Sequence, residues 1–411
     1  MFKYKIILIA FVFMLALTGC SVDDEVADDV ADEPIDIAAI DQVVVDANEN
    51  FAIDIFKALN SEDSGDNIFI SPLSISTALS MTYNGALEQT KEDMGSALGY
   101  LGIDLETVNS TYKNLINYLE QADKEVELLI SNSIWYREGE VIKEEFIDVN
   151  KEFYDAKVSA LNFSDDKSVD TINNWINDST KGKIEKMLTP PIDPDVIMYL
   201  INAIYFKGEW TDEFDESNTY STDFKNIDNE KESIEMMQRK GEVAYTESAD
   251  YKAVRLPYGQ EKTAMYVVLP SEDTYINAFI QEFDIDKFDE IKENMMITDD
   301  VNLQIPKFKL EYGIKNLNDS LISLGMASAF DTFANFDKIR EDIFISRVLH
   351  KAVIEVNEKG SEAAAVTVVE MALTSMPLNP IEFIADRPFL FIISDEETDT
   401  ILFIGKYSRV E

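Results

Sequence analysis

A single histidine and a single cysteine restrict the chemistry open to this chain of 411 residues. His350 and Cys20 cannot supply the usual four nitrogen and sulfur ligands of a zinc site, and they exclude a disulfide within the chain and an iron–sulfur cluster. A hydrolase built on Ser-His-Asp or Cys-His would have to use His350, and Ser346 on the same strand is no evident nucleophile partner for it. Carboxylate-only catalysis and a calcium site remain open by count.

The charge excludes a further class of partner. The chain carries 79 Asp and Glu against 35 Lys and Arg, a formal net charge of −44. Such a charge repels the phosphates of nucleic acids, and no basic cluster is large enough to reverse it locally, so we expect no nucleic-acid partner. The hydrophobic content of 46% is ordinary for a globular protein, so the acidity does not imply disorder throughout.

The amino terminus has the pattern of an export signal. Lys3 and Lys5 precede an apolar run over 6–17, which is too short for a relaxed membrane-spanning helix of about 20 residues. The run ends in 17–20, Leu-Thr-Gly-Cys, which resembles a prokaryotic lipobox and predicts lipidation of Cys20. The alternative is an ordinary signal peptide with an incidental cysteine. We expect an exported protein, anchored by lipid to the outer face of the cell membrane or released to the extracellular space.

The segment after the cysteine is acidic and contains no base before Lys57. It repels itself and has little to bury, which predicts an extended tether. The expected organisation is therefore a signal peptide over 1–19, the lipidated cysteine and tether over 20–45, and one folded domain over 46–411. An acidic tail that binds a basic partner is the alternative for the tether.

The remaining sequence mixes helical and strand patterns without strict alternation, which favours an α+β fold over a doubly wound sheet. Ser71 followed by Pro72 predicts the start of a helix. Further helices are expected over 51–59, 171–188 and 314–324. Strands are expected over 126–136, 199–206, 251–257, 264–269, 301–310, 389–394 and 400–405.

The segment 352–376 does not fit a plain core. A strand runs to Gly360, and 361–374 then contains neither Gly nor Pro. Read with a period of two, one face of this second part is suited to burial and the other begins and ends in glutamate. The burial face comprises Ala363, Ala365, Thr367, Val369 and Met371, and the other comprises Glu362, Ala364, Val366, Val368 and Glu370. The pattern alone favours an ordinary hairpin arm, but its small residues would also let it slip between existing strands.

Four motifs in order carry a resemblance to a known family. They lie at 67–75 (NIFISPLSI), 202–210 (NAIYFKGEW), 350–365 (HKAVIEVNEKGSEAAA) and 386–405, which holds DRPFLF and LFIG. The chain resembles the serpins over about 48–409. The resemblance implies three β-sheets, about eight or nine helices and an exposed reactive-centre loop, and it implies an inhibitor without catalytic residues or cofactor, not an enzyme.

In serpins a protease cleaves the loop and forms an acyl-enzyme, and the freed loop enters the main sheet as a new strand. From Gly360 to Thr374, at about 3.3 Å per residue, the loop would reach roughly 46 Å. Counting from Gly360 as in the family places the scissile bond at Thr374–Ser375, with cleavage after Leu373 or Met371 as alternatives. None of these is basic, which disfavours a trypsin-like target. Thr374 suits an elastase-like or subtilisin-like protease, and Leu373 a chymotrypsin-like or papain-like one.

The resemblance also assigns roles around the loop. The hinge is expected at Glu358, Gly360, Ser361, Glu362, Ala363, Ala364 and Ala365. Its small residues favour an inhibitor over a non-inhibitory serpin, although the family often has a small residue where Val366 stands. Ser71, Ser74, Asn202 and His350 are expected to form a hydrogen-bonded cluster where the sheet opens. Trp210, Lys307 and Glu358 are expected where the loop enters the sheet.

These inferences define the expected partners and one rival. The partners are a target protease, bound covalently, and a membrane through the lipid on Cys20, and the chain is expected to be monomeric. The rival is a lipid-anchored carboxylate hydrolase or solute-binding protein, for which the acidic runs 299–300 and 395–397 are the candidates. Both runs look like solvated turns, and no calcium-loop spacing or glycine-rich phosphate motif is present.

Overall fold

The computed structural model describes residues 37–361 and 381–410. The chain divides into two units, 1–35 and 36–411, and the fold described below belongs to the second unit. Among the helices of the described ranges, none combines the length and the apolar character needed to cross a membrane.

The described residues contain nine α-helices. They are α1 (Gln42–Glu62), α2 (Pro72–Tyr83), α3 (Glu88–Ala97), α4 (Leu105–Leu119), α5 (Glu144–Tyr154), α6 (Lys167–Ser179), α7 (Ile276–Glu282), α8 (Ile285–Glu293) and α9 (Asn318–Leu321). Short helical turns occur at Ile37–Ala39, Glu216–Asn218, Ile322–Met326 and Ala327–Phe330.

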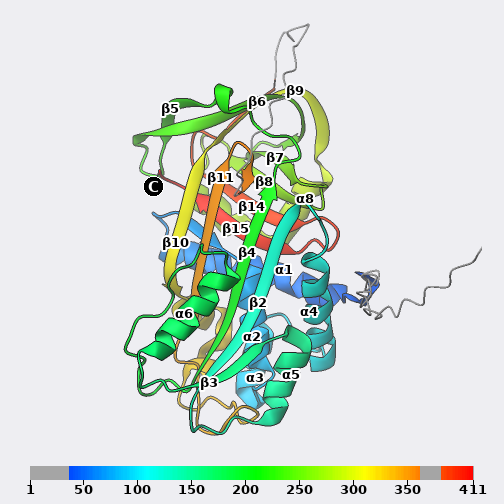
Figure 1. Ribbon diagram of the computed structural model, residues 1–411. Coiled ribbons are helices and arrows are strands. Elements are labelled where there is room, and N and C mark those ends of the chain that lie inside the picture. Colours follow the sequence, from blue (N-terminus) through cyan, green and yellow to red (C-terminus); the bar gives the residue numbers. More distant parts are fainter. Residues whose placement is uncertain (1–36, 362–380, 411) are drawn as a thin grey trace, which may run out of the picture. The chain divides into compact units, whose positions relative to one another are not determined.

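The strands form two sheets (Figure 1). The six-stranded sheet has the order β10 (Phe308–Asn316), β11 (Leu349–Asn357), β12 (Gly360–Ser361), β4 (Met198–Glu209), β2 (Val126–Arg137) and β3 (Lys157–Leu161). The nine-stranded sheet has the order β1 (Ile68–Ile70), β15 (Ile401–Tyr407), β14 (Phe389–Asp395), β8 (Thr263–Pro270), β7 (Tyr251–Tyr258), β6 (Lys231–Glu247), β9 (Met296–Pro306) and β13 (Ile381–Ile384), with β5 (Tyr220–Lys225) paired to β6. Two of the three expected sheets are thus joined, because the long β6 pairs with β5, β7 and β9.

Helix α2 packs against both sheets, on β4 and on β15. It begins as the sequence predicts: Pro72 occupies the first turn, and the Ser71 side chain accepts a hydrogen bond from the backbone N–H of Ser74. Its residues are buried almost along the whole length, so its position is fixed from both sides. The opposite face of the six-stranded sheet carries α6, whose Val169, Ile172 and Ile176 share a core with Trp135.

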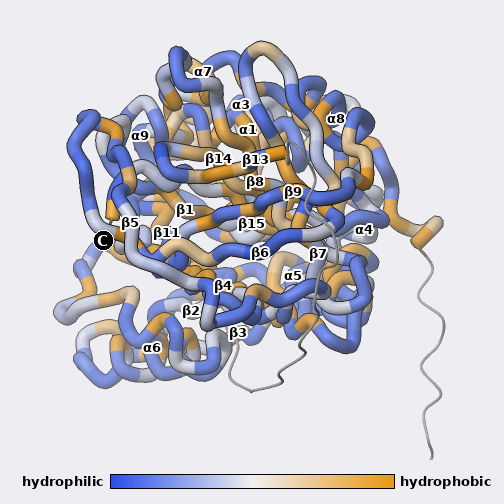
Figure 2. The backbone as a smooth tube through the Cα atoms, turned by 90° about the horizontal axis from the view of Figure 1, so that it is seen from above, coloured by the Kyte–Doolittle hydropathy of each residue, from blue (hydrophilic) through white to orange (hydrophobic). Residues whose placement is uncertain are grey.

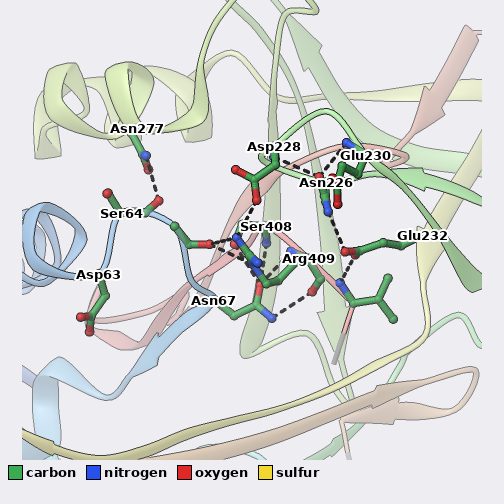
Figure 3. Close-up of polar contacts among 12 residues, drawn as sticks. Asp63, Ser64, Asn67, Asn226, Asp228, Glu230, Glu232, Asn277, Ser408 and Arg409 are labelled. Carbon is green, nitrogen blue, oxygen red and sulfur yellow. Dashed lines mark hydrogen bonds and ion pairs between the residues drawn. The ribbon is translucent and has the colours of Figure 1, made fainter.

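The carboxy-terminal hairpin, like the neighbouring β8, is completely buried in the nine-stranded sheet. Every residue of β14 and β15 is buried, and Figure 2 shows β14 among the hydrophobic segments. The Phe69 ring stacks on those of Phe391 and Phe403, with centroids 5.8 and 5.3 Å apart. Polar contacts then fasten the end of the chain (Figure 3): the Arg409 guanidinium donates to the Gly65 carbonyl at 2.9 and 2.6 Å.

Four boundaries differ from the sequence predictions. The ordered body begins before residue 46, because Ile37–Ala39 is helical and Val44 and Val45 of α1 are fully buried, so the predicted tether is too long at its end. Helix α6 ends at Ser179 and not at 188, because Lys181 adopts a left-handed conformation (φ 49°) and the N–H groups of Lys181 and Gly182 bond back to the carbonyls of Asp178 and Asn177. The strand predicted over 301–310 is two strands that separate at Lys307. The helix predicted over 314–324 begins only at Asn318, because β10 continues to Asn316.

Candidate functional site

The boundary between β4 and β11, here called the seam, is incompletely closed. In the described residues these two strands are joined only through β12, which pairs Ser361 with Val356 and with Gly208. Gly360 makes the adjoining pairs with Asn357 and Glu209. The pairings leave 198–207 of β4 and 349–355 of β11 without a strand between them. A sheet in this arrangement offers backbone donors and acceptors along two facing edges.

Gly360 is required at the upper end of the seam. Its φ is 149°, and a Cβ there would lie 2.1 Å from the Gly208 carbonyl oxygen, which is too close for any side chain. Gly208 is equally confined, because a Cβ on it would lie 2.9 Å from the Tyr258 ring. The two glycines let the chain after Lys359 turn back and start a strand between β11 and β4.

Trp210 and Tyr258 hold this turn in place. The Trp210 backbone N–H donates to the Lys359 carbonyl at 2.7 Å, and its indole Nε1 donates to the Asn357 carbonyl at 2.9 Å. Its ring stacks on Tyr258 with centroids 4.4 Å apart. The Tyr258 hydroxyl and the Ser361 hydroxyl are hydrogen-bonded at 2.7 Å, so Ser361 already faces the interior.

An ion pair lies beside the turn. Lys307 Nζ is 2.9 Å from Glu358 Oε2, with the glutamate side chain 6% exposed and the lysine side chain 46% exposed. Thr219 donates to the other carboxylate oxygen of Glu358 at 2.8 Å. Burial alone would raise the pKa of Glu358, but hydrogen bonds from Lys307, the backbone and Thr219 outweigh it and lower the pKa. The structure therefore brings Trp210, Lys307 and Glu358 together beside the start of β12.

His350 lies farther down the seam, on the inner face of β11. Its Nε2 accepts a hydrogen bond from the Ser71 backbone N–H at 3.2 Å, and Ser71 Oγ in turn accepts from the Ser74 N–H at 3.2 Å. The imidazole is 5% exposed, and this burial lowers the pKa of His350 to about 4. The side chain is thus neutral near pH 7, and it is tied to the start of α2.

Asn202 faces the same cavity from the side of β4, but no hydrogen bond in the described part of the chain joins it to Ser71, Ser74 or His350, so the predicted hydrogen-bonded cluster does not include it. Its Nδ2 donates to Asn132 Oδ1 at 2.8 Å, and Asn132 donates to the Tyr154 carbonyl. Its own Oδ1 is buried and has no hydrogen-bond partner among the described residues. The sequence interpretation missed Asn132, which lies directly opposite Asn202 in the β2–β4 register and could have been found only from that register.

Two cavities mark the seam. The larger, here called the seam cavity, has a volume of about 390 Å³ and is lined by Ser74, Asn202 and His350 among others. The smaller, of about 20 Å³, lies higher up, between 204–206 of β4 and Ala352 and Val353 of β11. Three of the four residues predicted for the sheet-opening cluster therefore share one cavity, and Ser71 is bonded to two of them.

Several predicted site residues lie outside the described residues. These are Cys20, the hinge residues Glu362, Ala363, Ala364 and Ala365, the scissile-bond residues Thr374 and Ser375, and the alternatives Leu373 and Met371. Of the predicted hinge, Glu358, Gly360 and Ser361 are described.

The acidic run 395–397 is engaged in local contacts. Asp395 Oδ1 accepts from the Thr398 hydroxyl at 2.7 Å, Glu396 pairs with Arg255 at 2.7 Å, and Glu397 pairs with Lys262 at 2.6 Å. No group of three or more His, Cys, Asp or Glu in the described ranges is arranged to hold a metal ion. The run therefore gives no support to the carboxylate-based rival.

Comparisons with known proteins agree with this geometry. The profile of the family described as Serpin (serine protease inhibitor) matches residues 46–410. A serpin-like protein of Methanosarcina acetivorans is 36% identical, with 100% of this chain and 99% of the relative covered. The native state of tengpin, a thermophilic serpin, superposes with a TM-score of 0.81 at 33% identity, covering 93% of this chain and 96% of tengpin. Human thyroxine-binding globulin in complex with thyroxine superposes with the same score at 27% identity, covering 90% of this chain and 99% of the globulin.

Proposed function

Because the chain belongs to the serpin family, we propose that it inhibits a protease as a suicide substrate, with 362–380 as bait and the seam as the receiving slot. The observation that carries the proposal is the pairing of Gly360 and Ser361 with both β11 and β4. A strand between these two edges has thus begun, and the rest of the slot is open along 198–207 and 349–355.

The register of β12 predicts which residues of β11 and β4 each following loop residue would face. If the chain continued past Ser361 without a bulge, Ala363 would lie opposite Ile354 and Phe206. Ala365 would lie opposite Ala352 and Ile204. The inner face would thus receive Ala363, Ala365, Thr367, Val369 and Met371, the set that the sequence marks for burial. Residues two apart along a strand point to the same face of the sheet, and so do residues paired directly across antiparallel strands. Because Ser361 is buried, these five residues would face the interior as well.

Small side chains suit this path. The upper inner face of the slot is bounded by Ile354 and by Phe206, whose ring meets the Tyr258 and Phe403 rings at centroid distances of 5.1 and 5.8 Å. Alanines can pass such rings without forcing the two strands apart, whereas a long or charged side chain would slow insertion. Glu362 would lie on the outer face opposite Glu355 and Lys207, where water can reach its carboxylate.

The length of the slot bears on the scissile bond. Met371 would lie opposite Met198, the first residue of β4. Met371 is about eleven residues from Gly360 along the loop, which at roughly 3.3 Å per residue spans about 36 Å. Residues 372–374 would extend beyond the end of β4. We place the bond at Thr374–Ser375, so an acyl-protease on Thr374 would be carried past the far end of the sheet. Cleavage after Leu373 or Met371 remains the alternative.

Insertion would release free energy, because two open strand edges and the cavities between them would be filled. The uncleaved protein is then held kinetically and not at its free-energy minimum. The target class that suits Thr374 is a serine protease of elastase or subtilisin type, with a chymotrypsin-like or papain-like protease if Leu373 is used. The similarity to thyroxine-binding globulin favours, as second candidate, a non-inhibitory serpin with a binding role.

The deciding experiment mixes the protein with elastase, subtilisin, chymotrypsin and papain. We expect a covalent band that survives denaturant with at least one of the serine proteases, and mass spectrometry of the released fragment identifies the bond. Cleavage of the loop without such a band would favour a non-inhibitory serpin. A loop left intact by all four proteases would remove the support for bait function.

We further propose that the protein is exported and anchored by a lipid on Cys20 to the outer face of the cell membrane. The support is the apolar run and lipobox-like motif at 6–20. Metabolic labelling with a fatty acid tests it: the label should be incorporated in the native sequence and absent from Cys20→Ser. Equal labelling of both forms would contradict it.

A further inference from the structure

Arg347 is the one arginine of the described ranges that pairs with neither a carboxylate nor a backbone carbonyl. The others form ion pairs (Arg239, Arg255, Arg340, Arg387 and Arg409) or donate to three backbone carbonyls (Arg137). The chain has 79 acidic against 35 basic side chains, so an arginine without a carboxylate partner is unexpected. A guanidinium suits carboxylate binding particularly well, because its fork of donors matches the two oxygens.

The side chain of Arg347 reaches across the lower end of the seam. It lies two residues before β11 and lines the seam cavity together with Tyr199 of β4. Burial raises the pKa of Tyr199, and the charge of Arg347 and a hydrogen bond with it oppose that rise. The two side chains therefore meet across the gap, although no strand in the described residues pairs their backbones.

Both side chains belong to the outer face of the sheet, the face that α6 covers (Figure 1). Tyr199 packs against the apolar core beneath α6, and its ring lies 5.7 Å from that of Phe163. Leu349, two residues after Arg347, packs against the same core. Side chains two residues apart on a strand share a face, so Arg347 lies on the same side as Tyr199.

The register of β12 brings one loop carboxylate to this place. Nine residues after Ser361, the same pairing would set Glu370 opposite both Arg347 and Tyr199. Glu362 and Glu370 are the only acidic residues of 362–380. The register thus joins Arg347 and Tyr199 through one loop residue, and their observed contact across the gap is independent support for that register.

The neighbouring loop residue fits the same face. Val368 would lie opposite Ile201 and Leu349, which are part of the core beneath α6 or pack against it. Arg347 is exposed, so Glu370 would arrive where the apolar cover ends. A valine would therefore meet apolar side chains, and the carboxylate would meet a guanidinium and a hydroxyl.

We propose that Arg347 is a positioning residue for loop insertion: with the Tyr199 hydroxyl, it receives the Glu370 carboxylate at the lower end of the seam. This inference rests on the proposed function and adds to it a contact that belongs to the inserted state. A slip of two residues along the strand would bring Val368 or Ala372 to Arg347 instead. The ion pair would thus favour one final register over its neighbours.

Charge reversal at the two positions tests the contact. The samples are the uncleaved full chain and the same chain cut once in the loop beyond Glu370, freed of protease, with the cut identified by mass spectrometry. In the cut chain, Arg347→Glu and Glu370→Arg should each lower the midpoint of thermal unfolding in guanidinium chloride by about 2–4 °C. The double variant should recover most of that loss. In the uncleaved chain the two changes should act independently.

Lys338→Glu is the matched control, because it makes the same charge change at an exposed position before β11 and outside the seam cavity. Glu370→Arg should not compensate it in either sample. If the losses from Arg347→Glu and Glu370→Arg simply add in the cut chain, the contact is overturned even though the loop inserts. A cut chain no more stable than the uncleaved one would show that the loop does not insert, which overturns the proposed function and this contact together.

Discussion

The seam and the carboxy-terminal hairpin are built from similar strands and closed in opposite ways. In the hairpin, β14 pairs with β15 on one side and with β8 on the other over its whole length, and all its residues are buried. At the seam, β4 and β11 meet only through Gly360 and Ser361, and two cavities lie between them. The hairpin is filled by stacked phenylalanine rings, whereas the seam holds a histidine, an asparagine and the serines beneath them.

This difference shows where the molecule can change without unfolding. Opening the hairpin would expose apolar rings and break ladders on both sides, as well as the Arg409 and Asn67 contacts that fasten the chain end (Figure 3). Opening the seam would break two backbone pairs and a few polar contacts. A new strand at the seam would replace those polar contacts by a complete set of backbone hydrogen bonds to β4 and β11. The fold thus combines a hairpin that is already fully paired with a seam that can still accept a strand.

The largest expected effect comes from the same substitution made in each region. Ile392→Ala in β14, where the side chain is 0% exposed, should lower the free energy of unfolding by about 4 kcal/mol. Ile204→Ala in β4, where the side chain is 8% exposed and already borders the small cavity, should cost about 2 kcal/mol. Urea denaturation of both variants checks this. Equal costs would break the contrast between a closed and an open region.

The next effect depends on pH. The folded-state pKa of His350, about 4, lies below its ordinary 6.5, so the neutral form is stabilised by folding. The associated stability is fully present above pH 6.5 and is lost as the pH falls from 6.5 to 4, by about 3 kcal/mol in total for this difference in pKa. His350→Asn removes the titration, so the stability difference between the native sequence and this variant should shift by about that amount over the same range. A constant difference would show that His350 is not held neutral at the seam.

A smaller effect is expected at the upper end of the seam. Glu358→Lys removes the ion pair with Lys307 and the bond from Thr219, which should cost about 2 kcal/mol and speed polymerisation or premature insertion. Native gels after incubation at raised temperature measure it. Glu216→Lys is the control, because it makes the same charge change at an exposed position of the neighbouring 216–218 turn. If Glu358→Lys stays as monomeric as the control, the ion pair has no role in controlling the opening of the seam.

The smallest expected effect concerns association. With a net charge of −44, the chain should attract a basic protease over a distance, so the rate of complex formation should fall about threefold to tenfold as salt screens the charges. The hydrolysis of an uncharged peptide by the same protease serves as the control. An inhibition rate indifferent to salt would leave the acidity of the body without a role in recognition.

The strands of the seam were predictable from the sequence, and the seam itself was not. β4 and β11 are marked by apolar runs and by motifs at 202–210 and 350–356, and Pro72 with Ser71 marks the start of α2. A period-two pattern predicts which face of a strand is buried, but it does not predict which strand edges remain unpaired. The β12 pairs and the two cavities depend on how segments far apart in the sequence pack together.

The sequence misplaced elements where tertiary pairing overrides local pattern. The apolar spacing of 314–324 resembles a helix, but pairing with β11 keeps β10 extended as far as Asn316. The unpaired oxygen of Asn202 could not be foreseen either, because it depends on the Asn132 partner across β2 and β4. The resemblance to serpins supplied the cluster of Ser71, Ser74, Asn202 and His350, and the structure supplied its geometry.

Two neighbouring alanines test the insertion of the loop into the seam most directly. In the β12 register Ala365 would face the interior, opposite Ala352 and Ile204, whereas Ala364 would face outward. Each is replaced by arginine, and the covalent complex is measured with a protease that the native sequence traps. Ala365→Arg should still be cleaved but form no complex, and Ala364→Arg should keep most of it. Complexes of equal yield from both variants would contradict insertion between β4 and β11 in this register.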